Sequence, residues 1–516
     1  MWQSFFEILT TRSGELFSLI QEHMYISLIS LGIAIIISVP LGIILTRFDK
    51  IAGPVIGVAS VFQTIPSLAL LVFMVPIIGT GQTPAIIALT IYGLLPILRN
   101  TYVGLNNVDK STIESARGMG MTNFQRLRIV ELPLAASVIM GGIRTATVLV
   151  VGVATVAGLI GAGGLGDFIF RGLSTNSAGL ILAGAIPAAV IALLFDFVLK
   201  YVEDKSQPGK KSSSVFSRVL FWLILIGLAV TFILVIVSNW MNNDDIVISG
   251  KQDTEQEILV YMYIELIEQD TDLNVGKESY ISGTSNLVAG MDRGQYDMYV
   301  EYTGTALIDI LNDSDFEYEN PDEVYDHVSE YYEEEMPAVW LEEIGFNNTY
   351  TLTVRGDFAE ENNLETISDL SPYAADMTFG STAEFQERSD GYIGVQEQYG
   401  IEFSSVQTMD SGIQYAALQN EEIDVIDAYA TDGRIEANNF VILEDNLGLF
   451  PPYYAAPVIR KDVLEEYPEL EDIINQLSGR IDDETMMRMN YEVDEEGRTA
   501  SEVAHEFLSE EGLLNE

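Results

Sequence analysis

The chain has 516 residues, with 26 Lys and Arg against 76 Asp and Glu, and it has no cysteine. A net charge of −50 at pH 7 argues against a nucleic acid as partner, because the phosphates would be repelled. Disulfides and thiolate metal sites are excluded, and the three scattered histidines (His23, His327 and His505) do not indicate a metal-ligand cluster.

The charge is divided very unevenly along the chain. Residues 1–240 (the membrane half) carry 15 Lys and Arg and 11 Asp and Glu, whereas residues 241–516 (the polar half) carry 11 and 65. The division follows the last long apolar run, so the sequence predicts a membrane-spanning part followed by a polar globular part. The acidity favours a solvated surface suited to salty surroundings, and it would also attract a cationic ligand.

Apolar stretches in the membrane half are long enough to be helices that cross a hydrocarbon core of about 30 Å. About 23 mixed residues precede the first stretch, which does not fit a secretory signal peptide. The third stretch is the shortest. The predicted spans lie near 24–46, 55–78, 84–98, 134–160, 178–199 and 219–238.

Positive charge predicts the orientation of these spans. Alternate connections are rich in Lys and Arg, whereas the opposite connections carry little beyond Arg12 and Arg171. The rich connections should face the cytoplasm, which places the start of the chain and the polar half outside. The charges that fix this orientation are Arg47, Lys50, Arg99, Lys110, Arg117, Arg126, Arg128, Lys200, Lys205, Lys210, Lys211 and Arg218.

The first five spans are predicted to form one domain, residues 1–200. Residues 201–218 are rich in Ser, Lys and Gly and are predicted to be a cytoplasmic linker. Residues 219–240 are predicted to form a sixth span that tethers an outer domain at 245–516.

One cytoplasmic connection, ESARGMGMTNFQRLRIVELPLA, runs from Glu114 to Ala135. Ala116 and its neighbour Ser115 are small enough for close docking, Gly120 permits a tight turn, and Pro133 marks entry to the next span. The segment resembles the EAA–G–LP coupling loop of bacterial ABC importer permeases, with a serine for the usual first alanine. The alternative is an amphipathic basic loop at the lipid headgroups.

The resemblance implies that this loop receives force from an ATPase. The chain has no GxxxxGK[ST] phosphate-binding sequence, so the ATPase is expected to be another polypeptide. That partner would bind the ATP and magnesium, and this chain is expected to bind no cofactor of its own.

In the polar half, short β-rich runs alternate with amphipathic helices, which predicts an α/β fold with a largely parallel sheet. The roughly 270 residues are enough for two lobes of average domain size. The sequence resembles the receptors for betaine, choline and carnitine that belong to the periplasmic-binding-protein class. The resemblance rests on SGKQDTEQ, SGTSNL, YDMYVEYTGTAL, ERSDGYIGVQEQYG, DVIDAYATDGRI and FPPYYAAP.

In that family two lobes close on a ligand by a hinge. The resemblance implies a first lobe at about 245–345 and 455–516, and a second at about 346–454. A trimethylammonium group donates no conventional hydrogen bond, so the faces of aromatic rings hold it. By motif the cage would be Tyr302, Tyr350, Tyr429 and Tyr453, with Gln256, Thr305 and Asn348 steadying the rest of the ligand.

Several positions remain open or depart from the family pattern. Tyr454 is a rival for Tyr453, and Asp253 stands where the family usually has an aromatic residue. Arg388 and Arg434 are expected to form structural or lobe-closing pairs. Any one of the 24 tyrosines is more commonly a core or surface residue than a ligand contact.

These features predict the permease and receptor of an ATP-driven importer, fused in one chain, for quaternary ammonium compounds such as glycine betaine, choline and carnitine. Osmoprotectant uptake at the plasma membrane, a homodimer and two partner ATPases are expected. An alternative cargo is ergothioneine or another trimethylammonium metabolite. A membrane-anchored chemoreceptor is a weaker alternative, since only loops and a short linker face inward, and no motif supports a hydrolase.

Overall fold

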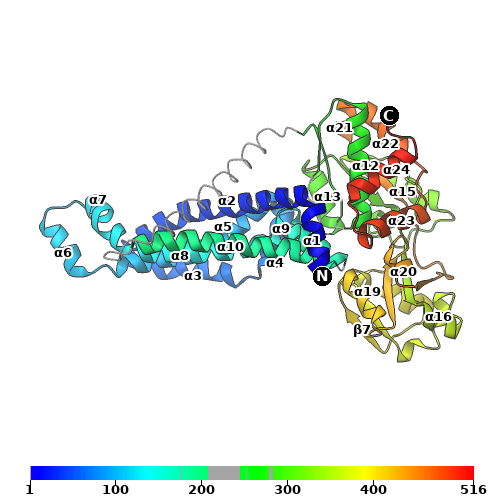
Figure 1. Ribbon diagram of the computed structural model, residues 1–516, viewed down its shortest axis with the longest axis horizontal. Helices are drawn as coiled ribbons and strands as arrows, with labels where there is room; N and C mark the ends of the chain where they lie inside the picture. The colour runs from blue at the N-terminus through cyan, green and yellow to red at the C-terminus, as the bar shows by residue number, and fades with distance from the viewer. Residues whose placement is uncertain (1, 176, 207–243, 252, 278–282, 516) are drawn as a thin grey trace. The chain divides into compact units, whose positions relative to one another are not determined.

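The computed structural model describes residues 2–175, 177–206, 244–251, 253–277 and 283–515 (Figure 1). The chain divides into two compact units, one made mostly of the membrane half and the other mostly of the polar half, and each is described by itself. The predicted tether and most of the predicted linker lie outside the described residues.

In the described part of the membrane half, four helices are apolar and long enough to cross a membrane: α2, α5, the continuous helix Asn123–Ala154 that includes α8, and α10. The third predicted span, 84–98, is too short, because the helix continues through polar residues on both sides of the apolar run. The helices are α1 (Trp2–Thr11), α2 (Ser13–Leu45), α3 (Asp49–Thr64), α4 (Ser67–Ile78), α5 (Gln82–Asn106), α6 (Lys110–Gly118), α7 (Asn123–Arg126), α8 (Leu132–Ala154), α9 (Leu165–Ser174) and α10 (Ala178–Ser206), with a π-turn η1 (Leu127–Glu131) and a 3₁₀ turn η2 (Val156–Ile160).

The second predicted span, 55–78, is not one straight helix. It is broken into α3 and α4, which meet at an angle of 96°. Pro66 causes the break, because the residue before a proline is pushed out of the helical region, and Ile65 is extended with ψ 130°. The structure therefore has a broken span where the sequence predicted a continuous one.

Glycines allow α2, α5 and α8 to pack closely. A Cβ on Gly42 would lie 2.7 Å from Cβ of Thr101, and one on Gly142 would lie 2.6 Å from Cβ of Asn100. Such contacts leave room only for hydrogen, as is common between membrane helices. Figure 1 shows α6 and α7 projecting beyond one end of this bundle.

The polar half contains two five-stranded sheets, ordered β2-β1-β3-β10-β4 in lobe I and β7-β6-β8-β5-β9 in lobe II. The predicted two-lobed α/β fold is present, but the sheets are mixed rather than largely parallel. In lobe I, β10 runs antiparallel to both of its neighbours, and in lobe II β5 does the same. Each of these two strands is the first one after the chain crosses from one sheet to the other, and each runs opposite to the strands beside it.

The elements of lobe I are β1 (Ile246–Ile248), α12 (Thr254–Asp270), β2 (Val275–Lys277), α13 (Thr284–Asp292), β3 (Met298–Tyr302), α14 (Thr303–Thr305), η3 (Ala306–Ile310), α15 (Pro321–Glu335), β4 (Ala338–Trp340), β10 (Ala455–Arg460), α21 (Lys461–Glu466), α22 (Glu469–Ile474), η7 (Asn475–Leu477), α23 (Asp483–Asp494) and α24 (Ala500–Glu510). Those of lobe II are β5 (Tyr350–Arg355), α16 (Gly356–Asn362), η4 (Ile367–Leu370), η5 (Ala374–Asp376), β6 (Thr378–Ser381), α17 (Ala383–Glu387), α18 (Tyr392–Gly394), η6 (Val395–Tyr399), β7 (Ser405–Thr408), α19 (Ser411–Gln419), β8 (Val425–Tyr429), α20 (Arg434–Ala437) and β9 (Phe440–Leu443).

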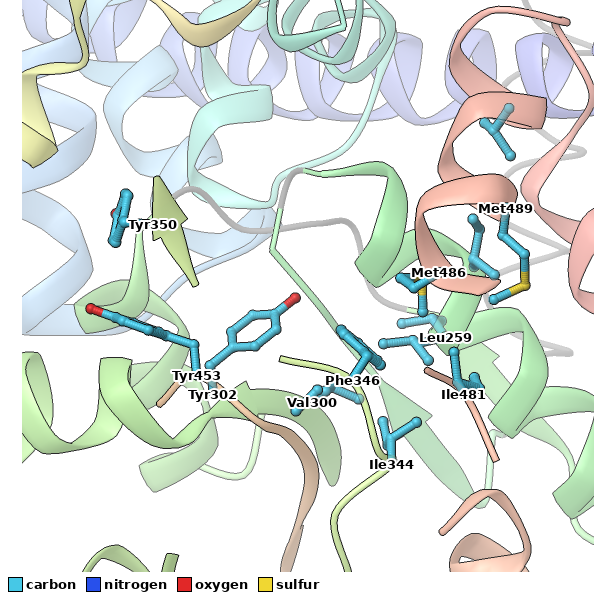
Figure 2. Packing of buried hydrophobic residues seen from close by; sticks show 14 of the residues in the cluster. Leu259, Val300, Tyr302, Ile344, Phe346, Tyr350, Tyr453, Ile481, Met486 and Met489 are labelled. Carbon is cyan, nitrogen blue, oxygen red and sulfur yellow. The ribbon is translucent and has the colours of Figure 1, made fainter. Parts of the chain in front are cut away.

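A cluster of buried apolar side chains extends from lobe I to the segments that connect the two sheets. Figure 2 shows it passing from Met489 through Phe346 to Tyr302, and on to Tyr453 and Tyr350. The tyrosines at the crossover segments are therefore anchored on a packed core. This fixes their rings before any ligand arrives.

Candidate ligand-binding site and coupling segment

Three of the four predicted tyrosines form a group of rings. Tyr350 begins β5 and Tyr429 ends β8, and the two residues are partners across that strand pair. Their ring centres are 4.9 Å apart, and the ring of Tyr453 stands edge-on to Tyr350 at 5.6 Å. Tilted and edge-on rings at such distances are the favourable arrangements for aromatic side chains. The three rings together offer aromatic faces to a cation.

Tyr453, rather than its rival Tyr454, lies beside Tyr350. Successive side chains of an extended chain point to opposite faces, so only one of the two can join the group. Tyr453 is 2% exposed, and a Cβ on Gly304 would come within 2.8 Å of its ring. The glycine of the EYTGT motif is thus needed to admit this ring.

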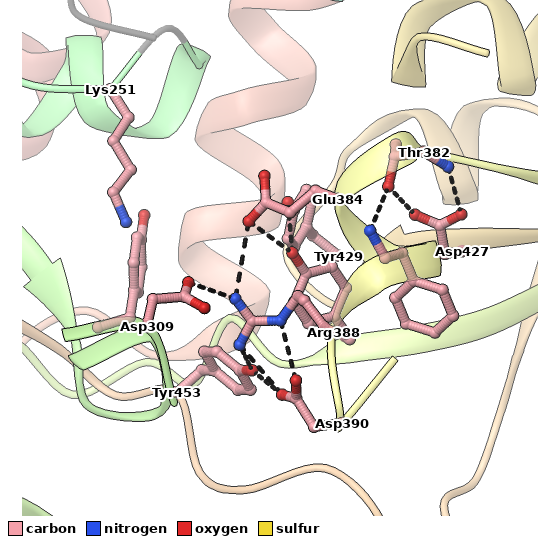
Figure 3. Close-up of polar contacts among 12 residues, drawn as sticks. Lys251, Asp309, Thr382, Glu384, Arg388, Asp390, Asp427, Tyr429 and Tyr453 are labelled. Carbon is pink, nitrogen blue, oxygen red and sulfur yellow. Dashed lines mark hydrogen bonds and ion pairs between the residues drawn. The ribbon is translucent and has the colours of Figure 1, made fainter. Parts of the chain in front are cut away.

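Arg388 lies over the same rings and joins the two lobes (Figure 3). Its Cζ is 5.3 Å from the ring centre of Tyr350 and 5.9 Å from that of Tyr453. The guanidinium pairs with Asp390 of its own lobe at 2.9 Å and with Asp309 of lobe I at 2.5 Å. The expected lobe-closing pair is therefore present at Arg388, whose guanidinium also lies beside the rings of Tyr350 and Tyr453.

Arg434 behaves differently from Arg388. Its side chain donates to Asp432 at 2.9 Å and its Cζ lies 4.0 Å from the ring centre of Tyr415, both in lobe II. These contacts are those of a structural pair within one lobe.

Tyr302 belongs to a second group. Its hydroxyl donates to Glu255 at 2.5 Å, and Figure 2 shows the hydroxyl turned away from Tyr350. Gln256 donates to the Tyr302 hydroxyl at 3.1 Å, and Asn348 donates to Glu255 at 3.0 Å. The structure therefore gathers Tyr302, Gln256 and Asn348 around a buried carboxyl that the sequence analysis did not single out.

Asp253, the departure from the family motif, caps helix α12. Its carboxylate accepts from the backbone N–H of Gln256 at 2.9 Å, a common N-cap interaction. The cap fixes Glu255 in the first turn of the helix, facing Tyr302. Burial raises the pKa of Glu255 to about 7, and the nearby Asp253 carboxylate raises it too.

The remaining predicted ligand residue, Thr305, ends the short helix α14 directly after β3 and is buried. Lys251, which the sequence analysis also passed over, lies with its Nζ 5.0 Å from the ring centre of Tyr302 and pairs with Glu301 at 2.5 Å. The position of Lys251 within the SGKQDTEQ motif was the only sequence signal that could have pointed to it.

A cavity of about 1250 Å³ adjoins the tyrosine group and shares Tyr350 with it. Asn347 and Thr349, just before the strand that carries Tyr350, and Thr351 within it also line the cavity. Its wall is acidic and aromatic, so a cation is attracted to it. The acidic and aromatic lining residues, besides Tyr350, are Phe316, Glu317, Tyr318, Glu319, Glu323, Glu444, Asp445 and Phe450.

In the membrane half the coupling segment has the local structure that its motif predicted. Helix α6 carries an exposed Glu114 and a buried Ala116. Gly120 has φ +78°, a backbone conformation that favours glycine, and Pro133 lies in the first turn of α8. Met119 is 71% exposed and Phe124 is 70% exposed, so the segment presents large apolar side chains at its surface.

An ion-pair cluster of three charged residues also holds this segment in place. The motif did not predict this cluster. Glu131, at the end of the π-turn η1, accepts from Arg126 at 2.6 Å and from Arg47 at 2.5 Å. Glu131 and Arg126 are both buried. Because Arg47 follows α2, the carboxylate ties the coupling segment to the end of the first span.

The comparisons with known proteins identify the family of the chain. Residues 9–207 match the family described as the inner membrane component of binding-protein-dependent transport systems, and residues 244–510 match the substrate-binding domain of ABC-type glycine betaine transport systems. The second match covers more than half of the chain. The chain belongs to the ABC importers of the glycine betaine type.

Relatives show both the fused and the separate arrangement. An ergothioneine transport permease and binding protein of Helicobacter pylori is 33% identical over 93% of this chain and 88% of its own length. A glycine betaine/carnitine/choline permease of Bacillus subtilis is 50% identical over 39% of this chain and 92% of its own length. A crystal structure of a glycine betaine/carnitine/choline transporter is 31% identical, covering 52% of this chain and all of that one, with a TM-score of 0.48.

The family places the chain in the plasma membrane as a multi-pass transporter subunit with an extracytoplasmic binding domain. The predicted fusion of permease and receptor, and its assignment to importers of the quaternary ammonium class, are confirmed at the level of the family. The assignment favours transport over a chemoreceptor or a hydrolase.

Proposed function

We propose that the polar half binds a trimethylammonium compound between its two lobes, with Tyr350, Tyr429 and Tyr453 enclosing the methylated cation. The observation that carries this proposal is the convergence of two rings on that of Tyr350, Tyr429 at 4.9 Å and Tyr453 at 5.6 Å, contributed by β8 and the segment before β10. Each ring that faces such a cation contributes about 0.5–2 kcal/mol, depending on how far the site is desolvated.

The surrounding charges support a cationic ligand. Arg388 and Lys251 are each paired with carboxylates, Arg388 with two of them. The acids of the adjoining cavity wall (Glu317, Glu319, Glu323, Glu444 and Asp445) leave the site with an excess of negative charge. A ligand that brings a positive charge is attracted, and an anion would be repelled. Tyr302, with Gln256, Thr305 and Asn348, would meet the other end of the ligand.

The transport cycle that we propose needs partners. A separate cytoplasmic ATPase, binding ATP and magnesium, would dock on the exposed side chains of α6 and α7. A permease of five spans would pair with a second copy of itself, giving a homodimer with two ATPases. The support is the match to the permease family together with the exposed Met119 and Phe124 on a rigidly held segment.

The ligand class is tested by calorimetric titration of the intact chain in lipid nanodiscs with glycine betaine, carnitine, choline and ergothioneine. At least one should bind, and tert-butylacetate, the uncharged-head isostere of glycine betaine, should bind far more weakly than glycine betaine. Failure of all four to bind would refute the proposed cage.

Ergothioneine is a second candidate, supported by a fused relative and by two buried acceptors that glycine betaine could not satisfy. The fused Helicobacter pylori relative is an ergothioneine transporter, and ergothioneine is a betaine of a thiol-histidine. Among the described residues, Gln256 Oε1 and Asn348 Oδ1 are buried acceptors without a donor. An imidazole N–H would supply one, whereas glycine betaine has no N–H or O–H. Tighter binding of ergothioneine than of glycine betaine in the same titration would decide for this cargo.

A further inference from the structure

Glu255 is a buried carboxyl that receives hydrogen bonds from several parts of the receptor. It is 3% exposed and sits in the first turn of α12, where the helix dipole favours negative charge. All four of its partners donate through uncharged hydroxyl or amide groups. They are Tyr302 at 2.5 Å, Asn348 at 3.0 Å, Thr431 at 2.5 Å and Asn490 at 3.4 Å.

One of these partners belongs to the other lobe. Thr431 follows β8 of lobe II, and its hydroxyl donates to Glu255 of lobe I. The carbonyl of Thr431 accepts in turn from Asn490 of α23, also in lobe I, at 2.9 Å. Lobe I therefore makes two hydrogen bonds to this one residue of lobe II, and both are lost when the lobes separate.

Among the residues that the structure describes, no Lys, Arg or His side chain pairs with the Glu255 carboxyl. Asp253 precedes it on the same helix, and Tyr302 faces it from β3. Beyond the donors, Asp494 of α23 and Arg434 of α20 interact with each other. Burial is the largest cause of its raised pKa of about 7, so the carboxyl is neutral in part near neutral pH.

A neutral carboxyl has a proton to donate, and an acceptor is at hand. The Asn348 amide contacts Glu255 through Nδ2, while its Oδ1 is buried and has no donor in the described part of the chain. Turning this amide by half a turn brings Oδ1 to the carboxyl, where it accepts the proton. The site can therefore satisfy either protonation state.

We propose that Glu255 is a proton-sensitive latch between the lobes: its neutral form stabilises the joined lobes, so protonation raises ligand affinity. The inference rests on the proposed function, in which the joined lobes hold the ligand. Glu255 acts here as a positioning residue through Thr431, not as a ligand contact.

The direction of the pH effect follows from the two states of the carboxyl. In the joined lobes its pKa is about 7; when the lobes part, water reaches it and the pKa falls toward the ordinary value of 4.5. Joining therefore takes up a proton, and the stabilisation is fullest below the lower value and lost as pH rises through the higher one. Each unit between the two pKa values corresponds to about tenfold in affinity.

The test is a titration of the full chain in nanodiscs with whichever of the four named compounds binds most tightly, at pH 5.5 and at pH 8. Wild type should bind roughly tenfold or more tightly at the lower pH. Glu255→Gln, which mimics the neutral carboxyl, should bind with nearly the same affinity at both. Glu343→Gln is the matched control: burial also raises the pKa of Glu343 to about 7, but its loop lies in lobe I, and the wild-type pH profile should remain.

Thr431→Val removes the hydroxyl that lobe II offers to Glu255 and keeps the shape of the side chain. It should weaken binding about fivefold or more at both pH values, since a hydrogen bond between the lobes is lost. The inference is overturned if Glu255→Gln keeps the pH dependence of wild type, or if Thr431→Val binds as wild type does. If wild type binds none of the four compounds at either pH, the proposed function itself fails, and the latch with it.

Discussion

Each half of this protein buries a glutamate at the place where its function is concentrated, and the two are compensated in different ways. Glu131 of the coupling segment and Glu255 of the receptor are both 3% exposed. Two arginines neutralise Glu131, whereas four uncharged donors surround Glu255. Fixed cations hold the first carboxylate in place, whereas the second, which accepts only from neutral donors, can take up a proton while the lobes stay joined.

The largest expected effect follows from removing the charge of Glu131. Glu131→Ala leaves Arg126 buried without its partner, so stability should fall by about 3–5 kcal/mol. Glu255→Ala leaves only neutral donors unsatisfied and should cost about 1–3 kcal/mol. Thermal unfolding of the intact chain in nanodiscs would compare the two variants.

Arg128→Ala is the control for this comparison, because Arg128 is an exposed residue of the same segment and its loss should change the melting temperature little. Equal destabilisation by Glu131→Ala and Glu255→Ala would contradict the distinction between the two carboxyls.

A smaller effect is expected at the tyrosine group. Tyr350→Leu keeps an apolar side chain but removes the aromatic face, so affinity for a quaternary ammonium ligand should fall by about 0.5–2 kcal/mol. Tyr350→Phe keeps the face and should bind nearly as wild type does. Calorimetric titration of the intact chain measures both.

Tyr454→Leu is the matched control, because this neighbour of Tyr453 lies outside the ring group. A loss of affinity at Tyr454 as large as that at Tyr350 would mean that the wrong tyrosines have been assigned to the ligand.

The last comparison concerns two glycines of the coupling segment. Gly120→Ala forces an alanine to adopt φ +78° and should cost about 1–2 kcal/mol. Gly118→Ala adds a Cβ in open space at the end of α6, where alanine is a better helix former, and should be neutral or slightly stabilising. Ligand-stimulated ATP hydrolysis with the co-purified ATPase should fall for the first variant only, and equal rates would show that the turn at Gly120 is not needed for coupling.

The two halves also differ in how far their sites could be predicted from the sequence. The coupling segment is contiguous, and its cap, its left-handed glycine and its proline act over a few residues, so the motif predicts its local structure. Arg47 lies more than eighty residues from Glu131 in the sequence, and its pairing depends on how α2 packs beside α8. That contact could not be read from the segment itself.

The receptor motifs named the tyrosines but not their grouping. Tyr350 and Tyr429 meet because β5 enters lobe II antiparallel to β8, a strand direction that the alternation of strands and helices did not predict. Tyr302 was expected in the same group, yet its hydroxyl is drawn to Glu255 and away from the other rings. Only the packing of α12 against β3 determines that choice.

Breaks in the apolar pattern were a weak guide to helix ends. The predicted second span continues past Pro66 because both sides are equally apolar, and the bend at Ile65 reflects the backbone of the residue before a proline. The third span was underestimated because polar residues continue the helix where the hydropathy falls.

The central claim is that tyrosine rings recognise the positive charge of a trimethylammonium group. It is tested most directly by titrating the intact chain with glycine betaine and with tert-butylacetate, which has the same shape and carboxylate but a neutral head. The account predicts that glycine betaine binds about tenfold or more tightly, because two or more rings face its charge. Equal affinities for the two compounds would contradict it.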